Sequence, residues 1–534
     1  MEQIYVEKTA SRGIAVAPVY LYLEPDLTPD GEKIPDTEVQ AELEKFAAAK
    51  NTVINELKQL AEKNEIFAAH LEIADDFMLQ DSVENKVKGE LKNIQLAVSE
   101  TIDEFAVIFD SMDDAYMKER AADVKDIGKR FMAALKGVKL PDLGGITEPS
   151  VVVARDMYPS DTVKIDTAFV KGILTEEGGV TSHVSIIAKS MGIPTLVGVK
   201  GILSKVQDGE TVCMDAGAGC VVVQPDAENV RIYQEKKEAY EAERARLESL
   251  RGTPAVTKDG KRIYLCANVG NVQDIKNALP MNIDGVGLFR SEFLYMQNTH
   301  FPTEEEQYTV YKEAAELIPS ELTIRTLDIG GDKELSYYEF EKEENPFLGW
   351  RAIRISLDMK DMFKAQLRAI LRASAFGHVR IMFPMIISLD ELRDAKALVE
   401  ECKQELRAEG VAFDEEIEMG MMIETPASVI LAEEFAREAD FFSIGTNDLT
   451  QYILAVDRGN KKIAKKYDYF NPAVVKAIGR VIEAGHKEGI KVGMCGEMAG
   501  DQKAVELLLD LGLDEFSMSA GSVDYVREQI LNRK

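Results

Sequence analysis

Two regions of the chain differ in the spacing of their hydrophobic residues. Residues 36–140 contain no proline, and apolar side chains recur there three or four positions apart, which predicts amphipathic helices. Because the connections between the apolar stripes are short and polar, we expect an antiparallel bundle of about four helices. The four stripes are Phe46, Val53, Leu57, Leu60; Phe67, Leu71, Ala74, Met78; Leu91, Ile94, Val98, Ile102, Phe105, Phe109; and Val124, Ile127, Phe131, Leu135.

Short apolar runs replace this pattern after Pro141. Five of them predict strands, at residues 150–155, 168–174, 195–199, 211–214 and 220–224. Together with the strand-like N-terminal segment they predict a small α/β domain, made of residues 1–25 and 141–225. The helical block, residues 26–140, is then an insertion after the first strand of that domain.

A highly charged segment, residues 226–254, predicts a helical linker that ends at RGTP, because glycine and proline cannot continue a helix. Beyond the linker, eight further strand-like runs alternate with helical patterns. These runs are 262–267, 285–288, 322–327, 379–384, 419–423, 441–444, 491–495 and 515–519. Eight βα units in residues 255–534 predict a TIM (β/α)8 barrel, with a doubly wound sheet as the alternative. The expected fold class is therefore a multidomain α/β protein.

The composition limits which classes of partner and which cellular compartment we expect. With 63 basic and 93 acidic residues among 534, the net charge is −30, which argues against nucleic acid and against an anionic membrane surface as partners. The five cysteines are scattered and form no CxxC pair, as in reduced cytosolic proteins. We find neither a signal-peptide pattern nor a run of ~18 apolar residues, so we expect a cytoplasmic protein.

Polar residues gather at the predicted carboxyl ends of the barrel strands, where TIM-barrel active sites lie. Glu424 and Asp448 suit a hard divalent cation such as Mg²⁺, and the arginines suit an anion with several oxygens. Any one of these residues alone could form a structural ion pair. Together they predict a site for a small phosphorylated or carboxylated metabolite. The residues are Arg290, Arg325, Glu424, Asn447, Asp448, Arg458 and Cys495.

A second candidate centre lies in residues 178–199, GGVTSHVSIIAKSMGIPTLVGV. The glycine pair permits a tight turn, and Thr181 or Ser182 can cap a helix that starts there. His183 then lies in the first helical turn, where backbone amides favour an anion. A neutral imidazole at this place is a competent phosphoryl acceptor. By position alone, the alternative is a histidine that merely packs or caps.

These segments resemble a known family. The GGVTSHVSIIAKSMGIPTLVGV segment is similar to the phosphohistidine motif of the phosphoenolpyruvate (PEP)-utilising enzymes. GLFRSEFLYM, IRTLDIGGDK, ENPFLGWRAIR, MIETPAS, GTNDLTQY and GMCGEMAG are similar to the PEP-binding barrel of that family. The helical insertion, with FAAHLEIADD and YMKERAADVKDIGKR, resembles the phosphocarrier-docking helices of enzyme I of the bacterial phosphotransferase system. The chain is thereby identified as a member of the phosphoenolpyruvate–protein phosphotransferases.

The resemblance implies that His183 is the nucleophile, phosphorylated on Nε2, and that Thr162 hydrogen-bonds its imidazole. It also implies that Arg290, Arg325 and Arg351 hold the phosphoryl group of PEP. His183 must then swing between the PEP site and a protein partner, with the charged linker as the hinge element.

For the rest of the barrel site, the resemblance implies that Asn447, the backbone near Asp448, and Arg458 hold the PEP carboxylate. Glu424 and Asp448 are then the Mg²⁺ ligands. Cys495 resembles the acid that protonates the enolate carbon to give pyruvate. The overall reaction would be the first step of sugar uptake by the phosphotransferase system.

The expected protein partner is the phosphocarrier protein HPr, docked on the helical block. His70, Glu72, Asp75 and Asp76 are the expected docking positions. The resemblance also implies a homodimer formed through the barrel.

Three other functions stay open from the sequence. One is a truncated PEP synthase or pyruvate phosphate dikinase, although the chain has no room for the large ATP-grasp module that precedes the phosphohistidine domain in those enzymes. Another is a regulatory module that senses PEP without turning it over. The third is a metal-dependent barrel lyase or aldolase, which would leave the GGVTSH segment unexplained.

Overall fold

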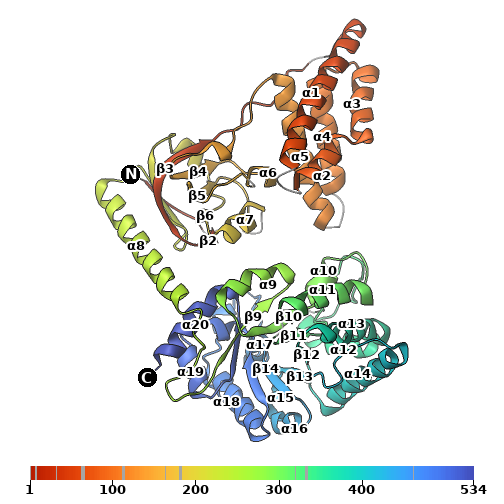
Figure 1. The fold of residues 1–534 in the computed structure, drawn as a ribbon, viewed down its shortest axis with the longest axis vertical. Helices are drawn as coiled ribbons and strands as arrows, with labels where there is room; N and C mark the ends of the chain where they lie inside the picture. The colour runs from red at the N-terminus through yellow and green to blue at the C-terminus, as the bar shows by residue number, and fades with distance from the viewer. Residues whose placement is uncertain are drawn as a thin grey trace. The chain divides into compact units, whose positions relative to one another are not determined.

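The computed structural model describes residues 2–6, 9–31, 33–61, 66–110, 115–162, 164–179, 183–318, 320–330, 335–460 and 462–533. Contacts divide the chain into two compact units, Met1–Glu243 and Arg244–Lys534. The N-terminal unit holds a helical block and a sheet domain, and the C-terminal unit holds a barrel (Figure 1).

In the helical block the described residues form five helices, where the sequence predicts about four. The second apolar stripe covers two of them, because α2 ends at Ala74 and a new helix begins at Phe77. The side chain of Asp76 caps this new helix by accepting a hydrogen bond from the Leu79 amide at 3.0 Å. Met78, counted in that stripe, is 64% exposed. The helices are α1 (Val39–Ala61), α2 (Ile66–Ala74), α3 (Phe77–Glu90), α4 (Ile94–Asp110) and α5 (Ala115–Lys136), preceded by the 3-10 turn η1 (Asp36–Glu38).

An eight-stranded mixed sheet forms the rest of the N-terminal unit, in the order β1-β8-β7-β3-β4-β5-β6-β2. The helical block lies between β3 and β4, so it is an insertion, but it follows the third strand and not the first. Because β3 and β4 pair in parallel, the block serves as their crossover connection. The strands are β1 (Glu2–Tyr5), β2 (Thr9–Ser11), β3 (Ile14–Tyr22), β4 (Ser150–Ala154), β5 (Val170–Thr175), β6 (Thr195–Leu196), β7 (Thr211–Asp215) and β8 (Cys220–Val223).

Short helical segments connect these strands. They are η2 (Leu143–Gly145), α6 (Pro159–Thr162), α7 (His183–Met191) and η3 (Ile202–Ser204). The predicted linker is the helix α8 (Ala227–Ser249). Its exposed faces carry ion pairs four residues apart, such as Arg231 with Glu235 and Arg244 with Glu248, which is typical of a solvated helix.

The C-terminal unit is a closed barrel of eight parallel strands, in which the last strand pairs with the first. This confirms the predicted α/β multidomain fold with a TIM barrel, and the doubly wound alternative is wrong. The strands are β9 (Tyr264–Val269), β10 (Gly285–Arg290), β11 (Leu322–Arg325), β12 (Val379–Phe383), β13 (Met419–Ile423), β14 (Phe441–Ile444), β15 (Lys491–Met494) and β16 (Glu515–Met518).

Helices surround the barrel strands (Figure 1). They are α9 (Val272–Ala278), α10 (Glu292–Met296), α11 (Glu304–Leu317), α12 (Ile353–Asp358), α13 (Lys360–Ala373), α14 (Leu389–Glu409), α15 (Pro426–Ile430), α16 (Ala432–Ala436), α17 (Thr446–Leu454), α18 (Pro472–Lys487), α19 (Val505–Asp510) and α20 (Ala520–Asn532). The 3-10 turns are η4 (Leu279–Met281), η5 (Pro346–Leu348), η6 (Ser374–Phe376), η7 (Ala464–Lys466) and η8 (Glu497–Gly500).

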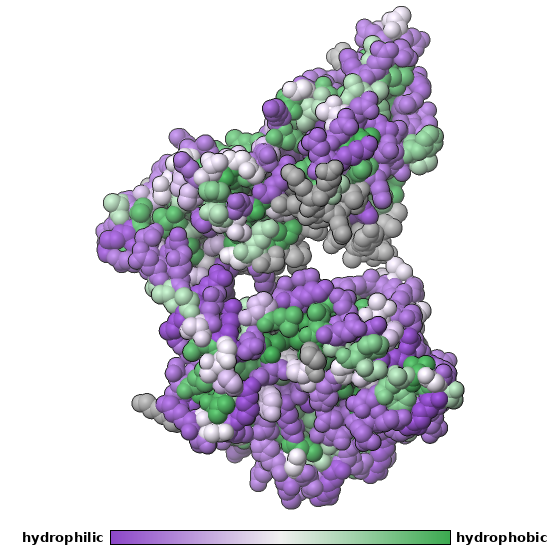
Figure 2. Space-filling model, in the orientation of Figure 1, coloured by the Kyte–Doolittle hydropathy of each residue, from purple (hydrophilic) through white to green (hydrophobic). Residues whose placement is uncertain are grey.

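Hydrophilic residues cover most of the visible surface of each unit (Figure 2), as the high content of charged residues requires. Among the helices that the structure describes, none combines the length and the apolar composition of a membrane span.

Candidate active site

One pocket opens at the carboxyl ends of the barrel strands, with a volume of about 430 Å³. Every barrel residue that the sequence singled out lines it, although these residues come from strands and loops spread over more than 200 positions of the chain. They are Arg290, Arg325, Arg351, Glu424, Asn447, Asp448, Arg458 and Cys495. Three acidic residues that the sequence analysis did not select, Glu292, Asp328 and Glu497, line the same pocket.

Arg325 and Arg351 are the buried cations of the pocket. Arg325 ends β11, and its Nη2 lies 2.6 Å from Glu292 and 2.9 Å from Asp328. Arg351, from the loop before α12, is only 2% exposed and contacts Asp328 at 2.9 Å. Burial alone would lower the pKa of each guanidinium, but the neighbouring carboxylates outweigh it and hold the pKa above its usual range. Both arginines therefore stay charged.

The arginines keep hydrogen-bonding capacity for a ligand. Among the described residues, neither the Nε of Arg325 nor that of Arg351 has a hydrogen-bond partner, although both atoms are buried. Since buried donors without partners are costly, an anion in the pocket would satisfy them. The set fits a multiply charged anion such as a phosphate ester.

Glu424 and Asp448 bring two carboxylates together beside Asp328. Glu424 follows β13, is fully buried, and its Oε1 accepts a hydrogen bond from the Met385 amide at 2.7 Å. Burial, together with the charges of Asp448 and Asp328, raises the pKa of Glu424 to about 8. A Cβ at Gly445 would lie 3.0 Å from Glu424 Oε2, so a glycine leaves room for this carboxylate.

This crowding of negative charge suits a divalent cation. In the described part of the chain, Asp448 Oδ1 is buried without a hydrogen-bond donor, and the guanidinium nitrogen Nη2 of Arg458 lies 3.7 Å from it. A hard metal ion between the two carboxylates would satisfy that oxygen and relieve their repulsion. Glu424 and Asp448 are therefore chemically suited to hold Mg²⁺.

Asn447 directly precedes Asp448 in α17, and Arg458 lies in the loop after that helix. The side-chain oxygen of Asn447 accepts a hydrogen bond from the Glu497 amide at 3.0 Å, and Tyr467 donates to its backbone oxygen at 3.1 Å. Arg458 is held by its backbone amide, which donates to Gln451 at 3.1 Å. Its guanidinium is partly exposed, as suits a group that meets an entering ligand.

Cys495 directly follows β15 and packs with an apolar cluster that includes Met422 and Leu288. Burial raises the pKa of its thiol to about 11, so the sulfur carries its proton at neutral pH. The backbone is fixed by Asn268, whose side-chain amide donates to the Cys495 carbonyl at 2.9 Å. A protonated thiol at the pocket wall can act as an acid.

The second predicted centre falls partly outside the described residues. The helix α7 begins at His183, but the His183 side chain and the proposed caps Thr181 and Ser182 lie outside the described part. Thr162 ends α6 and is buried. The hydrogen bond between Thr162 and His183 stays a prediction.

His70 is wrong as a docking position. Its side chain is 0% exposed, and its Nε2 lies 3.0 Å from Asp123 while its Nδ1 lies 3.3 Å from Asp126. A partner cannot reach a histidine buried inside the helical block. The other expected docking positions, Glu72, Asp75 and Asp76, are exposed.

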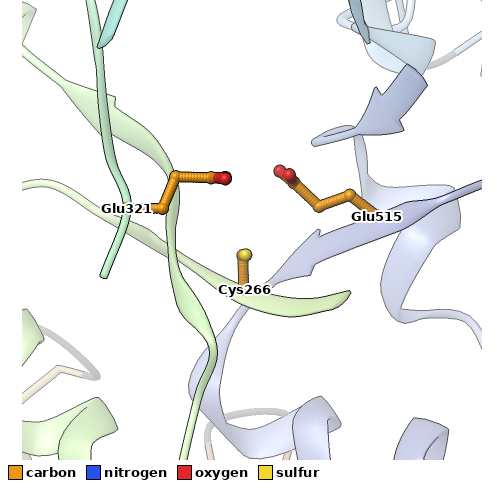
Figure 3. A group of neighbouring side chains, drawn as sticks. All are labelled: Cys266, Glu321 and Glu515. Carbon is orange, nitrogen blue, oxygen red and sulfur yellow. The ribbon is translucent and has the colours of Figure 1, made fainter. Parts of the chain in front are cut away.

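A further titratable cluster lies at the opposite, amino-terminal ends of the strands. Figure 3 shows Glu321 and Glu515 pointing toward each other, with the Cys266 sulfur between their stems. The spacing of the three groups could hold a metal ion. However, Lys491 Nζ lies 3.0 Å from Glu321 and 2.7 Å from Glu515, so the protein supplies its own cation there. We assign this cluster to stability.

Three family models match the chain. They are described as the PEP-utilising enzyme N-terminal domain at residues 8–120, the mobile domain at 146–219, and the PEP-binding domain at 244–534. The phosphoenolpyruvate-protein phosphotransferase of Bacillus subtilis is 46% identical over 98% of this chain and 93% of its own length. The chain belongs to the phosphoenolpyruvate-protein phosphotransferases.

Other members of the phosphoenolpyruvate-protein phosphotransferase family are equally similar. The protein of that name from Geobacillus stearothermophilus is 46% identical over 98% of this chain and 92% of its own length. A solution NMR structure titled Enzyme I (nEIt) is 39% identical over 45% of this chain and 100% of its own, with a TM-score of 0.41. The PEP-binding family model covers the whole barrel, and with it every residue that lines the pocket.

Proposed function

We propose that this protein transfers the phosphoryl group of PEP to its own His183, and then to a histidine of the phosphocarrier protein HPr, with release of pyruvate. The observation that carries the proposal is the pocket itself. Four arginines, two neighbouring carboxylates and a protonated thiol converge at the carboxyl ends of the barrel strands. PEP presents a phosphate, a carboxylate and a carbon that must be protonated, and this set matches each of them.

Each side chain has one task in the proposed reaction. Arg290, Arg325 and Arg351 bind the phosphoryl oxygens, while Asn447 and Arg458 hold the carboxylate. The bond between phosphorus and the enol oxygen breaks as a bond to Nε2 of neutral His183 forms. The enolate left behind then takes a proton at its methylene carbon from the Cys495 thiol, which gives pyruvate and makes the transfer hard to reverse.

Charge neutralisation is the main requirement of such a transfer. Glu424 and Asp448 are the residues that would hold Mg²⁺, which supplies positive charge to the phosphoryl and enolate oxygens when bound. The arginines supply the remainder, and their fixed forks orient the phosphoryl group.

His183 belongs to the N-terminal unit and the pocket to the C-terminal unit, so the two must approach each other during the first transfer. We propose that α8, which runs from one unit into the other, is the hinge element. The exposed acidic positions Glu72, Asp75 and Asp76 then steer a partner with a basic patch to the helical block. We further propose a cytoplasmic homodimer that acts at the first step of sugar uptake; five free cysteines, all buried, suit a reducing compartment.

The experiment incubates the full chain with PEP labelled at phosphorus, Mg²⁺ and HPr. We expect acid-labile label on the protein, label on HPr, and one pyruvate per phosphoryl group. His183→Ala should lose all label, whereas His378→Ala, which removes an exposed histidine bonded to the Ser320 carbonyl, should keep it. Label that persists in His183→Ala would overturn the assignment. Labelling from ATP in place of PEP would instead favour a synthase or dikinase.

A further inference from the structure

Asp328 joins two arginines of the pocket through its two carboxylate oxygens. Oδ2 lies 2.9 Å from Arg325 Nη2, and Oδ1 lies 2.9 Å from Arg351 Nη2. Asp328 itself is 2% exposed. One buried carboxylate therefore bridges two buried guanidinium groups that come from different segments of the chain.

The backbone around this bridge is packed as tightly as the side chains. Gly330 has a φ of +92°, and a Cβ there would lie 2.8 Å from the Trp350 carbonyl oxygen and from the Arg351 Cβ. The Ala352 amide donates to the Ile329 carbonyl at 3.0 Å. The segment that directly follows Asp328 is thus held against the backbone on both sides of Arg351.

The second anionic neighbour of Arg325 does not have this arrangement. Glu292 lies 2.6 Å from Arg325 Nη2, and among the residues that the structure describes no ion pair joins Glu292 to Arg351. Glu292 therefore neutralises one arginine, whereas Asp328 fixes the separation and orientation of two. Substitution of Glu292 can therefore serve as the control for substitution of Asp328 in the same pocket.

We propose that Asp328 is a positioning residue, which holds Arg325 and Arg351 at the spacing that a phosphoryl group requires as it moves between oxygen and nitrogen. The proposal rests on the proposed function. Two buried like charges repel each other, so without a shared anion they would separate until a ligand drew them together. With Asp328 in place the arginines are arranged before PEP binds, and no reorganisation is needed during transfer.

Three variants test this role. Asp328→Asn replaces one acceptor oxygen by an NH₂ group, which must face an arginine donor and so breaks one side of the bridge. Asp328→Glu keeps the charge but moves the carboxylate by about 1.5 Å. Glu292→Gln is the matched control, because it weakens one contact of Arg325 and leaves the bridge intact.

The readouts separate positioning from folding and from simple binding. PEP-dependent pyruvate release gives kcat and KM for each variant. PEP affinity is measured separately by titrating the fluorescence of Trp350, the only tryptophan of the chain, in a His183→Ala background where no transfer occurs. Urea unfolding followed by the same tryptophan identifies a variant that fails to fold, in which case Asp328→Glu carries the test.

We expect Asp328→Asn and Asp328→Glu to lower kcat by about 100-fold, with PEP affinity changed less than about threefold. Glu292→Gln should lower kcat by less than about tenfold. In a double-mutant cycle, Asp328→Asn should cost much less when Arg351 is already lysine. A kcat unchanged in both Asp328 variants, or additive effects in the cycle, would overturn the proposal. If wild type releases no pyruvate from PEP, the proposed function fails instead.

Discussion

Lys129 of α5 and Tyr158 of the sheet domain form a cation–π pair, with 4.8 Å between the ammonium nitrogen and the ring centroid. The Tyr22 ring lies 5.8 Å from the same nitrogen, Asp161 lies 3.9 Å away, and Glu24 forms an ion pair with it. This Lys129 cage fastens the helical block to the sheet domain directly beside α6, the helix that ends at Thr162.

Replacing Lys129 by methionine should destabilise the N-terminal unit by about 2 kcal/mol. The substitution keeps most of the apolar stem but leaves Asp161 without its cation, in a place where burial already raises the pKa of that carboxyl. Hydrogen exchange measured by mass spectrometry should show faster exchange in peptides from α5 and α6, while barrel peptides stay unchanged.

The matched control for this prediction is Lys136→Met on the same helix. Lys136 pairs with Asp30 at 3.3 Å, and Asp30 is largely exposed, so its loss should change stability by less than about 1 kcal/mol. Equal effects of the two substitutions would show that the cage does not fasten the two domains.

Cys495→Ala should slow pyruvate release by about 100-fold or more, because the enolate loses its proton donor. PEP affinity, followed by Trp350 fluorescence, should stay within about threefold, since the thiol contributes little to binding a charged ligand. Cys402→Ala is the control, because Cys402 is a buried cysteine of α14 that lies outside the pocket. Pyruvate release at the wild-type rate in Cys495→Ala would rule out its role as the acid.

Removal of divalent cations should stop PEP-dependent phosphorylation, and Mg²⁺ should restore it. Glu424→Gln removes one of the two proposed ligands, so we expect a rise of at least tenfold in the Mg²⁺ concentration that gives half-maximal rate. Mg²⁺ should also strengthen PEP binding in a His183→Ala background but not in the double variant with Glu424→Gln. A wild-type Mg²⁺ dependence in Glu424→Gln would place the ion elsewhere.

Much of this site could be predicted, because a residue's position relative to a barrel strand decides whether it lies at the catalytic end. In a TIM barrel the residue that follows a strand lies at the catalytic end, so Arg290, Arg325 and Cys495 could be placed from the strand pattern and the motifs alone. Asp328 could not be selected in this way. Its role depends on Arg351, which lies 23 positions further along the chain and approaches it only through the tertiary fold.

The helical block shows the complementary error. His70 lies three positions after Phe67 and four before Ala74, so helical spacing already puts it on the buried face. The acidic residues that follow His70 favour a docking surface, but the helical spacing of His70 itself predicts that it is buried. Similarly, Asp76 is a helix-capping residue type inside an apolar stripe, and this signal marks the start of the additional helix α3.

The Glu321–Glu515 pair at the amino-terminal end of the barrel should make barrel stability depend on pH. Burial, and next the charge of Glu515, raise the pKa of Glu321 to about 7 from 4.5, although Arg380 and Lys491 oppose the shift. Folded protein thus binds a proton on Glu321 that unfolded protein releases between these values, so the stability that Glu321 contributes is present below pH 4.5 and is lost as pH rises toward 7.

Glu321→Gln should abolish this dependence, because the amide stays neutral at every pH. Relative to wild type, the variant should gain up to about 3 kcal/mol in unfolding free energy between pH 5 and pH 8. Glu515 does not interfere, since Lys491 and Arg380 overcome its burial and hold its pKa at about 2. Urea unfolding followed by the fluorescence of Trp350, which lies in the barrel unit, measures the change.

The control is Glu418→Gln, whose half-exposed carboxylate lies 4.0 Å from Arg380. Parallel pH profiles for wild type and Glu321→Gln would mean that Glu321 is ionised throughout, neutralised by its two cations.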